Sequence, residues 1–456
     1  MKTIHEDYMK KSNSIILTEG KILPAILNLT WPMIGTSLLM MLYSFTDIWC
    51  VSRIGSNAVS AVGTGGFVLW FSVAGASIFR LGTQVKVSHA LGRRDENSAK
   101  SYALSGIHSA FLCGVIMLFI VLFFADDFIN FFKFKDVTVI LMCKAYLFPI
   151  ALSMPFSFLN PVFTGLITAS GRSRYPFFIN LIGLCINIPL NFLLVFGLFN
   201  FPSMGVKGAA FSTMTSQVVM CICFVFVIKK LNIPFYDFKL FVWPDIKKSY
   251  EITKTGLPYG IQDMCFAAIS VVIGRFVAFF GNSEISAQKI GSQLEGLSWQ
   301  TADGFSSALS VFVGQNYAAE KFDRVKKGYF VTLAFSCTIG LIACLIFCFA
   351  GDKLFSLFFK DDLEAVSAGK EYLFILGFSQ IFMCIEITTA GFFNGKGDTV
   401  TPSVVGVVFT ALRIPFAYAL SKTELAINGI WLTICVSSVI KGVFLVILLI
   451  KKKKLI

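Results

Sequence analysis

Charged residues are scarce in this chain of 456 residues. Asp, Glu, Lys and Arg together make up 14% of it, whereas a typical soluble domain has about 25%. Histidine is scarcer still, with three scattered residues and no HExxH pattern. Because an enzyme needs a clustered set of catalytic groups, we do not expect this chain to be one.

Motifs for nucleotide, metal and disulfide chemistry are also lacking. The segment GFFNGKGD (391–398) does not have the GxxxxGK[ST] spacing of a phosphate-binding loop, so energy from ATP is not expected. The twelve cysteines form no CxxC pair and lie mostly in apolar segments. We interpret them as small buried hydrophobes. The first 21 residues are polar and do not resemble a signal peptide.

Hydrophobic residues are abundant instead, at 56% of the chain with 50 phenylalanines. They fall in blocks that, with their flanks, reach the roughly 20 residues needed to cross a bilayer. We predict an all-α polytopic membrane protein with twelve transmembrane helices. The predicted spans are 24–52, 58–88, 100–125, 138–168, 175–198, 206–229, 251–280, 284–315, 327–350, 364–393, 400–420 and 426–450.

The net charge of +13 indicates membrane topology rather than nucleic-acid binding. Lys and Arg gather at the N-terminus and in every second loop, as expected of the cytoplasmic side. We therefore predict a multi-pass protein of the cell (plasma) membrane with both termini cytoplasmic. The connector 229–254 mixes aromatic residues with lysine. It is either a partly helical link along the membrane interface or a plain loop.

The second half of the chain repeats the first. KAYLF (144–148) returns as KEYLF (370–374), an offset of 226. The register runs from about residue 32 to residue 191 and then slips by five. Prolines and glycines coincide in pairs at this offset: Pro32 and Pro258, Gly55 and Gly281, Gly165 and Gly391, Pro176 and Pro402, Pro189 and Pro415. The paired prolines are either hinges or tolerated kinks.

Each half holds six predicted spans. An even number returns the chain to its starting side, so the halves are parallel repeats, and such folds place substrate between the repeats near the midplane. We predict two pseudo-symmetric six-helix lobes. The predicted parts are a cytoplasmic N-terminal segment (1–23), an N-lobe (24–229), a cytoplasmic interfacial connector (230–250), a C-lobe (251–450) and a basic cytoplasmic C-terminus (451–456).

Six segments, in order and in both halves, resemble the multidrug and toxic compound extrusion (MATE) transporters. The resemblance covers nearly the whole chain. It implies two six-helix lobes that export drug-like, often cationic compounds in exchange for Na⁺ or H⁺. The segments are FTDIWCVSRIGSNAVSAVG (45–63), GLITASGRSRYP (165–176), INIPLN (186–191), GVKGAAFST (205–213), VFVGQNYAAEKFDR (311–324) and GFFNGKGDTVTPS (391–403).

The resemblance also implies an ion-coupling cluster in the N-lobe. In the DinF-like branch an Asp on the first helix is joined by polar residues on helices 4, 5 and 6. The matching positions here are Asp47, Asn160, Asn187, Asn191 and Thr213. That branch has an Asp where this chain has Asn191, so one carboxylate is missing. A carboxylate inside a membrane is a functional candidate; the alternatives for Asp47 are a structural hydrogen bond or a position at the extracellular end.

The C-lobe carries its own candidates for ion coupling. Glu386 is the repeat counterpart of Asn160, and NorM-like and eukaryotic relatives have an acid on the same helix. A second acid of those relatives, on helix 7, matches Phe266 here, and Asp263 one turn earlier is the candidate substitute. Carboxylate oxygens suit Na⁺, and a lone buried acid also suits a proton. Asp47 and Glu386 are therefore the candidate Na⁺ ligands.

A polar stripe marks the predicted span 284–315. Its members recur at spacings of three or four on one helical face: Gln288, Ser292, Glu295, Trp299, Asp303 and Ser306. In lipid such a stripe must face protein or water. We predict that it lines a substrate cavity, in which Glu295 and Asp303 attract cations and Trp299 stacks on flat ones. The alternative is a packed polar seam in which Lys289 neutralises an acid.

Three basic residues also fall inside predicted spans. Arg413 begins RIP, the repeat partner of NIP at 187–189. It is expected to pair with a C-lobe acid such as Glu386 or to contact the substrate. Arg275 and Lys441 are expected to snorkel toward the membrane surface.

These observations predict a secondary active multidrug efflux antiporter that works by alternating access of two lobes. It would exchange amphipathic or cationic organic compounds for Na⁺ or H⁺, and need no cofactor beyond the coupling ion. Its expected partners are small-molecule organic cations or drugs and membrane lipids, with no nucleic acid, and it is expected to act as a monomer. The alternative is a lipid or lipid-linked oligosaccharide flippase, for which a strongly cationic cavity is expected. A membrane enzyme or receptor is a more distant alternative.

Overall fold

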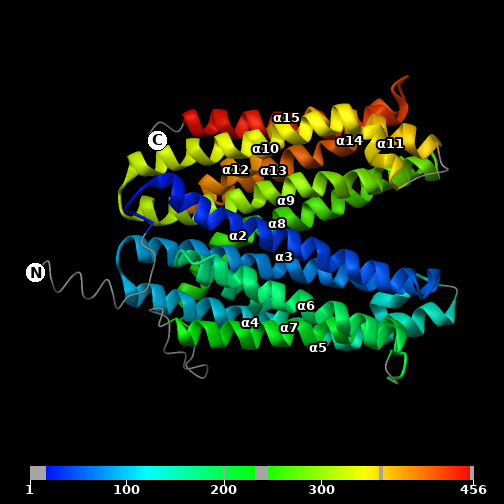
Figure 1. Cartoon of the computed structure of the whole chain (residues 1–456), viewed down its shortest axis with the longest axis horizontal. Coiled ribbons are helices and arrows are strands. Elements are labelled where there is room, and N and C mark those ends of the chain that lie inside the picture. Colours follow the sequence, from blue (N-terminus) through cyan, green and yellow to red (C-terminus); the bar gives the residue numbers. More distant parts are fainter. Residues whose placement is uncertain (1–16, 135, 199–200, 232–244, 359–362, 452–456) are drawn as a thin grey trace, which may run out of the picture. The chain divides into compact units, whose positions relative to one another are not determined.

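The chain is helical throughout the part that the computed structural model describes, which is residues 17–134, 136–198, 201–231, 245–358 and 363–451 (Figure 1). Within these ranges there is no strand, and the predicted all-α class is confirmed. The helices are α2 (Ile22–Ser52), α3 (Ser56–Gly92), α4 (Glu96–Phe131), α5 (Val137–Ala169), α6 (Arg174–Phe196), α7 (Gly205–Lys230), α8 (Ile246–Ala278), α9 (Asn282–Ala318), α10 (Phe322–Ser356), α11 (Leu363–Gly377), α12 (Gln380–Lys396), α13 (Val400–Ala411), α14 (Arg413–Ser421) and α15 (Ala426–Lys451).

Ten helical segments in the described part are long and apolar enough to cross a membrane, and the bent pair α11 and α12 makes an eleventh. The remaining predicted span, 284–315, lies in α9, which has 37 residues but many polar ones. Large hydrophobic side chains are exposed along the helices. Phe123 and Phe349, which are equivalent in the repeat, are 74% and 80% exposed. The chain is therefore a multi-pass membrane protein.

The duplication is visible in the helices themselves. Both α3 and α9 have 37 residues and begin 226 positions apart, and both α7 and α15 have 26 residues. The halves differ where the second is broken. α5 is continuous, whereas its counterpart is divided into α11 and α12, which meet at 51°. The counterpart of α6 is likewise divided into α13 and α14 at Leu412.

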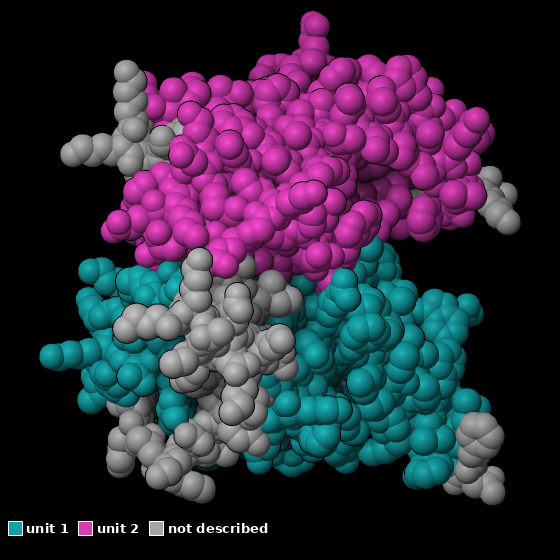
Figure 2. Space-filling model, turned by 60° about the vertical axis from the view of Figure 1, so that its left-hand side comes forward, with its two compact units in different colours: residues 1–16, 35–260 teal, residues 17–34, 261–456 magenta. Residues whose placement is uncertain are grey.

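The chain forms two compact units, coloured separately in Figure 2. Of the described residues, unit 1 holds 35–260 and unit 2 holds 17–34 and 261–456. The boundaries fall inside α2 and α8, at positions that the repeat offset makes equivalent. Each half of the chain therefore gives the start of its first helix to the other unit. This exchange is not part of the sequence prediction, which kept 24–229 and 251–450 as separate lobes.

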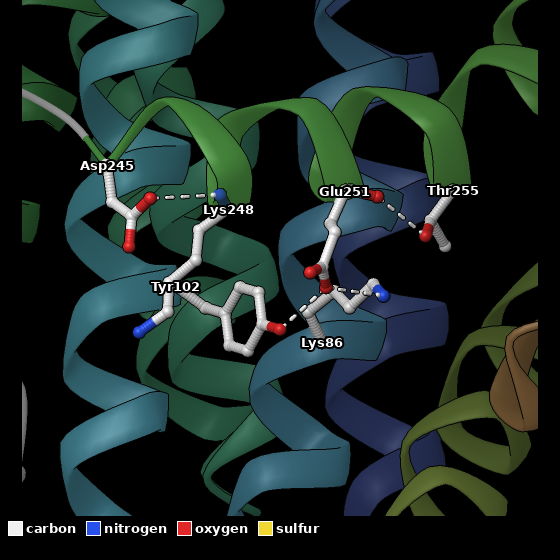
Figure 3. Close-up of polar contacts among 6 residues, drawn as sticks. All are labelled: Lys86, Tyr102, Asp245, Lys248, Glu251 and Thr255. Atoms are coloured by element: carbon white, nitrogen blue, oxygen red, sulfur yellow. Dashed lines mark hydrogen bonds and ion pairs between the residues drawn. The ribbon is translucent and has the colours of Figure 1, made fainter.

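In unit 1 the start of α8 is fixed to α3 and α4 (Figure 3). The Glu251 carboxylate accepts from Lys86 Nζ at 3.1 Å and from the Tyr102 hydroxyl at 2.7 Å. Beyond this ion pair, Gly256 lies so close to α3 that a Cβ atom there would overlap the carbonyl oxygen of Ile78. Glycine is what allows the two backbones to meet.

In unit 2 the start of α2 is fixed to α9 and α10. The Arg324 guanidinium donates to three carbonyl oxygens that precede the helix, those of Leu17 at 3.1 Å, Glu19 at 3.1 Å and Gly20 at 2.8 Å. Further along, Leu29 packs in one buried cluster with residues of α9. These contacts hold the first turns of α2 in unit 2.

A glycine and an isoleucine meet at the same crossing in both units, with their helices exchanged. In unit 1, Gly260 of α8 faces the Ile78 side chain of α3. In unit 2, Gly304 of α9 faces Ile34 of α2. At the offset of 226, Ile34 corresponds to Gly260 and Ile78 to Gly304. The crossing is thus kept in both units, although the small residue lies on opposite helices.

The predicted connector falls largely outside the described residues, because 232–244 are not among them. Residues 246–250, predicted as connector, belong to α8, which begins five residues before the predicted span. Residues 1–16 and 452–456 of the predicted terminal segments also lie outside the described part.

The contact of Gly256 with α3 predicts a position-specific loss of stability. Gly256→Ala should push α8 away from Ile78 and lower the free energy of unfolding by about 1–3 kcal/mol, as overpacking generally does. Gly274→Ala is the matched control on the same helix, because a Cβ there meets nothing within 4 Å. It should be neutral or stabilising. Thermal unfolding in detergent measures both, and equal midpoints for the two variants would contradict the packing described.

Candidate functional site

The predicted N-lobe residues come together in unit 1 around Asp47 on α2. Asn191 of α6 donates from Nδ2 to Asp47 Oδ1 at 2.5 Å, and Thr213 of α7 donates to Asp47 Oδ2 at 3.3 Å. Asn191 also donates to Asn187 Oδ1 at 3.0 Å. Ser212, which the sequence did not suggest, donates to Asn191 Oδ1 at 2.6 Å. Two helices, α6 and α7, thus supply polar groups to one carboxylate on α2.

No cation pairs with Asp47 among the described residues. Its hydrogen-bond partners, Asn191 and Thr213, are an amide and a hydroxyl, both neutral donors. Two further polar atoms of this neighbourhood are buried without a hydrogen-bond partner in the described part, the Tyr43 hydroxyl one turn before Asp47 and Asn187 Nδ2. Buried polar groups are normally satisfied, so the cluster retains hydrogen-bonding capacity.

Asn160, the fifth predicted member of the cluster, forms its hydrogen bonds with Gln217 instead of with the Asp47 network. Its Nδ2 donates to the Gln217 carbonyl oxygen at 2.9 Å and to Gln217 Oε1 at 2.7 Å. Both bonds join α5 to α7, and no hydrogen bond to Asp47 is formed. The structure therefore brings four of the five predicted residues into one network and puts Asn160 in a second contact with α7.

In unit 2, Glu386 of α12 forms a buried ion pair with Lys441 of α15. Lys441 Nζ lies 2.9 Å from Glu386 Oε1, and the two side chains are 7% and 11% exposed. The prediction that Lys441 snorkels to the membrane surface is wrong. Because an ionised side chain inside the protein needs a partner, the buried carboxylate of Glu386 holds Lys441 in place.

Arg413, expected to pair with an acid or to contact substrate, is buried at the start of α14. It donates from Nε to Ser437 Oγ at 2.6 Å and from Nη2 to Ser438 Oγ at 3.1 Å. Both serines lie on α15. Glu386 acts on Arg413 through space, and its ion pair is with Lys441.

Glu295 of α9 lies at the breaks of the second half. Tyr372 of α11 and Gln380 of α12 are within hydrogen-bonding reach of its carboxyl group, and the charge of Arg413 acts on it. Gln380 is the first residue after the bend between α11 and α12, and Arg413 is the first after the break at Leu412. Glu295 is therefore close to the beginnings of two half-helices.

The rest of the polar stripe is not buried uniformly. Gln288 accepts a hydrogen bond from Trp431 Nε1 at 3.2 Å, and Ser306 is buried. Ser292 is exposed, and Trp299 is 45% exposed. Asp303 and Asp263 are both half-buried. Some residues of the stripe therefore make contacts inside unit 2, and others lie at the surface of that unit.

Sequence reasoning missed the residues that complete these networks. Lys441 corresponds to Met220 in the repeat, so the repeat gave no sign of a charge there. The spacing along α15 could have indicated it, because Lys441 lies one helical turn after Ser437 and Ser438, the two serines that bind Arg413. Gln217 and Gln380 carry no charge, so nothing in the sequence distinguished them from ordinary buried amides.

The Glu386–Lys441 pair predicts a stability difference between single and double substitutions. Glu386→Gln leaves Lys441 buried without its counter-charge and should lower the free energy of unfolding by about 3–5 kcal/mol. Adding Lys441→Met, the residue type found at the equivalent Met220, removes both charges and should restore most of that loss. Thermal unfolding of both proteins in the same detergent gives the comparison. A double variant no more stable than the single one would contradict the pairing.

Comparisons with known proteins agree with this architecture. The family model MatE matches residues 32–193 and again 258–419, two equal ranges at the repeat offset of 226. A probable multidrug resistance protein NorM of Thermotoga maritima is 28% identical over 415 residues, which are 89% of this chain and 88% of that protein.

Solved structures share the fold. A MATE structure in complex with MaL6 superposes with a TM-score of 0.89 at 20% identity, over 96% of this chain and 98% of that one. A MOP superfamily transporter from Pyrococcus furiosus superposes with a TM-score of 0.88 at 19% identity, over 95% and 96% of the two chains; its binding pocket is described as having reverse polarity. MatE proteins are transporters, so the expectation that the chain is not an enzyme is confirmed. With both halves matched by the family model, the chain belongs to the MatE family of membrane transporters.

Proposed function

We propose that the protein is a secondary active efflux antiporter that exchanges small organic compounds for Na⁺ or H⁺. The observation that carries this proposal is Asp47, a membrane-embedded carboxylate held by neutral donors from α6 and α7. A carboxylate without a fixed counter-ion is costly in a membrane. It gains stability when a cation or a proton binds, and so it suits reversible ion exchange.

The position of Asp47 on α2 supports a link between ion binding and conformational change. α2 begins in unit 2, where Arg324 fixes its start, and has passed into unit 1 before Asp47. An ion at Asp47 therefore acts on a helix that both units hold. Coupling requires that the ion and the exported compound favour different arrangements of the protein.

Na⁺ and H⁺ are both compatible with the Asp47 cluster. Oxygen atoms of Asp47, Asn187 and Thr213 are the hard ligands that Na⁺ prefers. A proton requires only Asp47 itself, because one added hydrogen neutralises the carboxylate. The substitution of an Asp by Asn191, relative to the DinF-like pattern, leaves one titratable group in the cluster.

The class of exported compound is proposed from the relatives and from unit 2. The NorM relative of Thermotoga maritima carries a multidrug resistance name, which supports efflux of amphipathic or cationic drugs. Trp299 is 45% exposed on α9 and Asp303 is half-buried one turn later. An aromatic face next to a carboxylate is suited to flat organic cations.

A second candidate is a flippase for anionic lipids or lipid-linked oligosaccharides. Arg413 and Lys441 are buried in unit 2, and the Pyrococcus furiosus transporter provides an example of reversed pocket polarity on this fold. Each cation has acids near it, however. Lys441 pairs with Glu386, and the charges of Glu386 and Glu295 both act on Arg413. Because two acids balance two bases, the drug antiporter is the better supported proposal.

We further propose that the protein acts as a monomer in the cell membrane with both termini cytoplasmic. The support for the orientation is the concentration of Lys and Arg in alternate loops, including the exposed Arg93 and Arg174. Lipids contact the exposed apolar side chains.

The antiport proposal predicts gradient-driven efflux that depends on Asp47. Ethidium efflux from oriented proteoliposomes, under a Na⁺ gradient and then a proton gradient with the other ion balanced, should respond to one of them. Asp47→Asn should reduce this coupled efflux about 5–150-fold, the usual size of coupling between sites. Asp126→Asn is the control, because Asp126 is 66% exposed in a surface ion pair with Lys144.

The outcomes separate the two candidates. Full coupled efflux by Asp47→Asn would refute the role of this carboxylate. Silence of the folded wild-type protein under both gradients would favour the flippase candidate.

A further inference from the structure

Positive charge is concentrated at one end of unit 1, where α3 ends and where α4 and α8 begin. Residues 86–100 and 245–254 hold seven Lys and Arg against four Asp and Glu. The equivalent ranges in unit 2, which are 312–326 and 19–28, hold four against three. The basic excess is therefore a property of unit 1 and is not required by the repeated framework.

Three of the four acids at this end are held by helix starts or by an ion pair. Asp95 accepts from a backbone N–H in the first turn of α4 at 3.0 Å. Asp245 accepts from two backbone N–H groups in the first turn of α8, at 3.0 Å and 3.3 Å. Glu251 accepts from Lys86 Nζ and from the Tyr102 hydroxyl. These contacts leave the other basic side chains without a counter-charge from the same acids.

Lys248 of α8 is the clearest case. Its Nζ atom lies 5.3 Å from the centre of the Tyr102 ring, and Lys86 Nζ lies 5.9 Å from the centre of the same ring. In Figure 3 the Lys248 ammonium points away from Glu251, whose carboxylate is turned to Lys86. Lys248 takes part in none of the ion pairs of the described part. Two ammonium groups therefore share one ring, and only that of Lys86 has a counter-charge.

The start of α8 also presents an apolar face. Ile246, Tyr250 and Leu257 are exposed and lie on one side of the helix. The exposed Lys247 lies beside this side. An apolar face bordered by lysines is typical of a helical segment at the boundary between lipid head groups and acyl chains.

We propose that this end of unit 1 is a binding site for an anionic phospholipid. Lys247 and Lys248 of α8 hold the phosphate, together with Arg93, which is exposed at the end of α3 and lies two helical turns after Lys86 on the same face. The acyl chains cover the exposed apolar side of α8. A phospholipid matches both the charge and the apolar face, whereas free phosphate matches the charge alone.

The bound lipid would stabilise the anchored start of α8. Its phosphate supplies the counter-charge that Lys248 lacks, so that the two ammonium groups on the Tyr102 ring no longer repel each other. Glu251 then keeps its contact with Lys86. Since α8 passes from unit 1 to unit 2 after residue 260, the lipid acts on a helix that both units hold. This role goes beyond the proposed antiport function and does not depend on it.

Native mass spectrometry of the purified full-length protein tests the site. The protein is titrated with dioleoyl phosphatidylglycerol and, separately, with dioleoyl phosphatidylcholine, which has the same acyl chains and no net charge. Lys248→Gln should weaken binding of the anionic lipid about fivefold, the usual contribution of one basic residue near an anionic surface, and leave binding of the neutral lipid unchanged. Lys327→Gln is the control, because it removes the same charge from an exposed position on α10 of unit 2.

Each alternative has its own result. Equal losses of phosphatidylglycerol affinity in Lys248→Gln and Lys327→Gln would indicate general attraction to a basic surface and overturn the proposal. So would equal affinity of the wild-type protein for the two lipids, or displacement of phosphatidylglycerol by inorganic phosphate alone. Lys247→Gln, expected to act like Lys248→Gln, replaces it if that variant does not fold. Failure of the antiport function leaves this result untouched, because lipid binding is measured without an ion gradient.

Discussion

The structure depends on one constraint, that a polar or charged group inside a membrane must find its partner within the protein. The two units meet it with different chemistry. Unit 1 surrounds the Asp47 carboxylate with amides and hydroxyls, and Asn191 and Ser212 bind in series behind it. Unit 2 uses charged side chains. Lys441 forms an ion pair with Glu386, and two serines accept hydrogen bonds from Arg413. The same helical framework therefore holds an acid without a basic partner at Asp47 in unit 1 and an acid paired with a base at Glu386 in unit 2.

This division makes sense of the broken helices. Unit 1 keeps α5 and α6 continuous, and its polar groups are side chains on intact helices. In unit 2 both counterparts are interrupted, and Gln380 and Arg413 begin the second pieces. Helix starts expose backbone N–H groups and favour negative charge. Polar side chains of unit 2 therefore gather where its helices are interrupted.

Much of this fold follows from the sequence. Hydropathy predicted the spans, because it is a local property of the chain. The coincidence of glycines and prolines revealed the duplication, because it depends only on a fixed offset. The Asp47 network followed from a resemblance. The Lys441 pair did not, since a lysine within an apolar helix is interpreted as snorkelling until its neighbour is known. Nor did the break at Leu412, because Pro415 beside it has a counterpart, Pro189, inside an unbroken helix. The exchange of helix starts depends on contacts between segments that are far apart in the chain, such as Gly256 with Ile78, and these cannot be inferred from any one segment.

The exchanged glycine and isoleucine bear on the history of the duplication. A single ancestral half could have built the same two crossings as a pair of identical subunits, each lending its first helix to the other. The present halves could not. Two copies of the first half would press Ile34 against Ile78, and two copies of the second would leave Gly260 opposite Gly304, with no side chain to fill the crossing. Once the halves were fused and the residues had diverged, each half fitted only its covalent neighbour, so neither can return to an independent existence as a symmetric dimer.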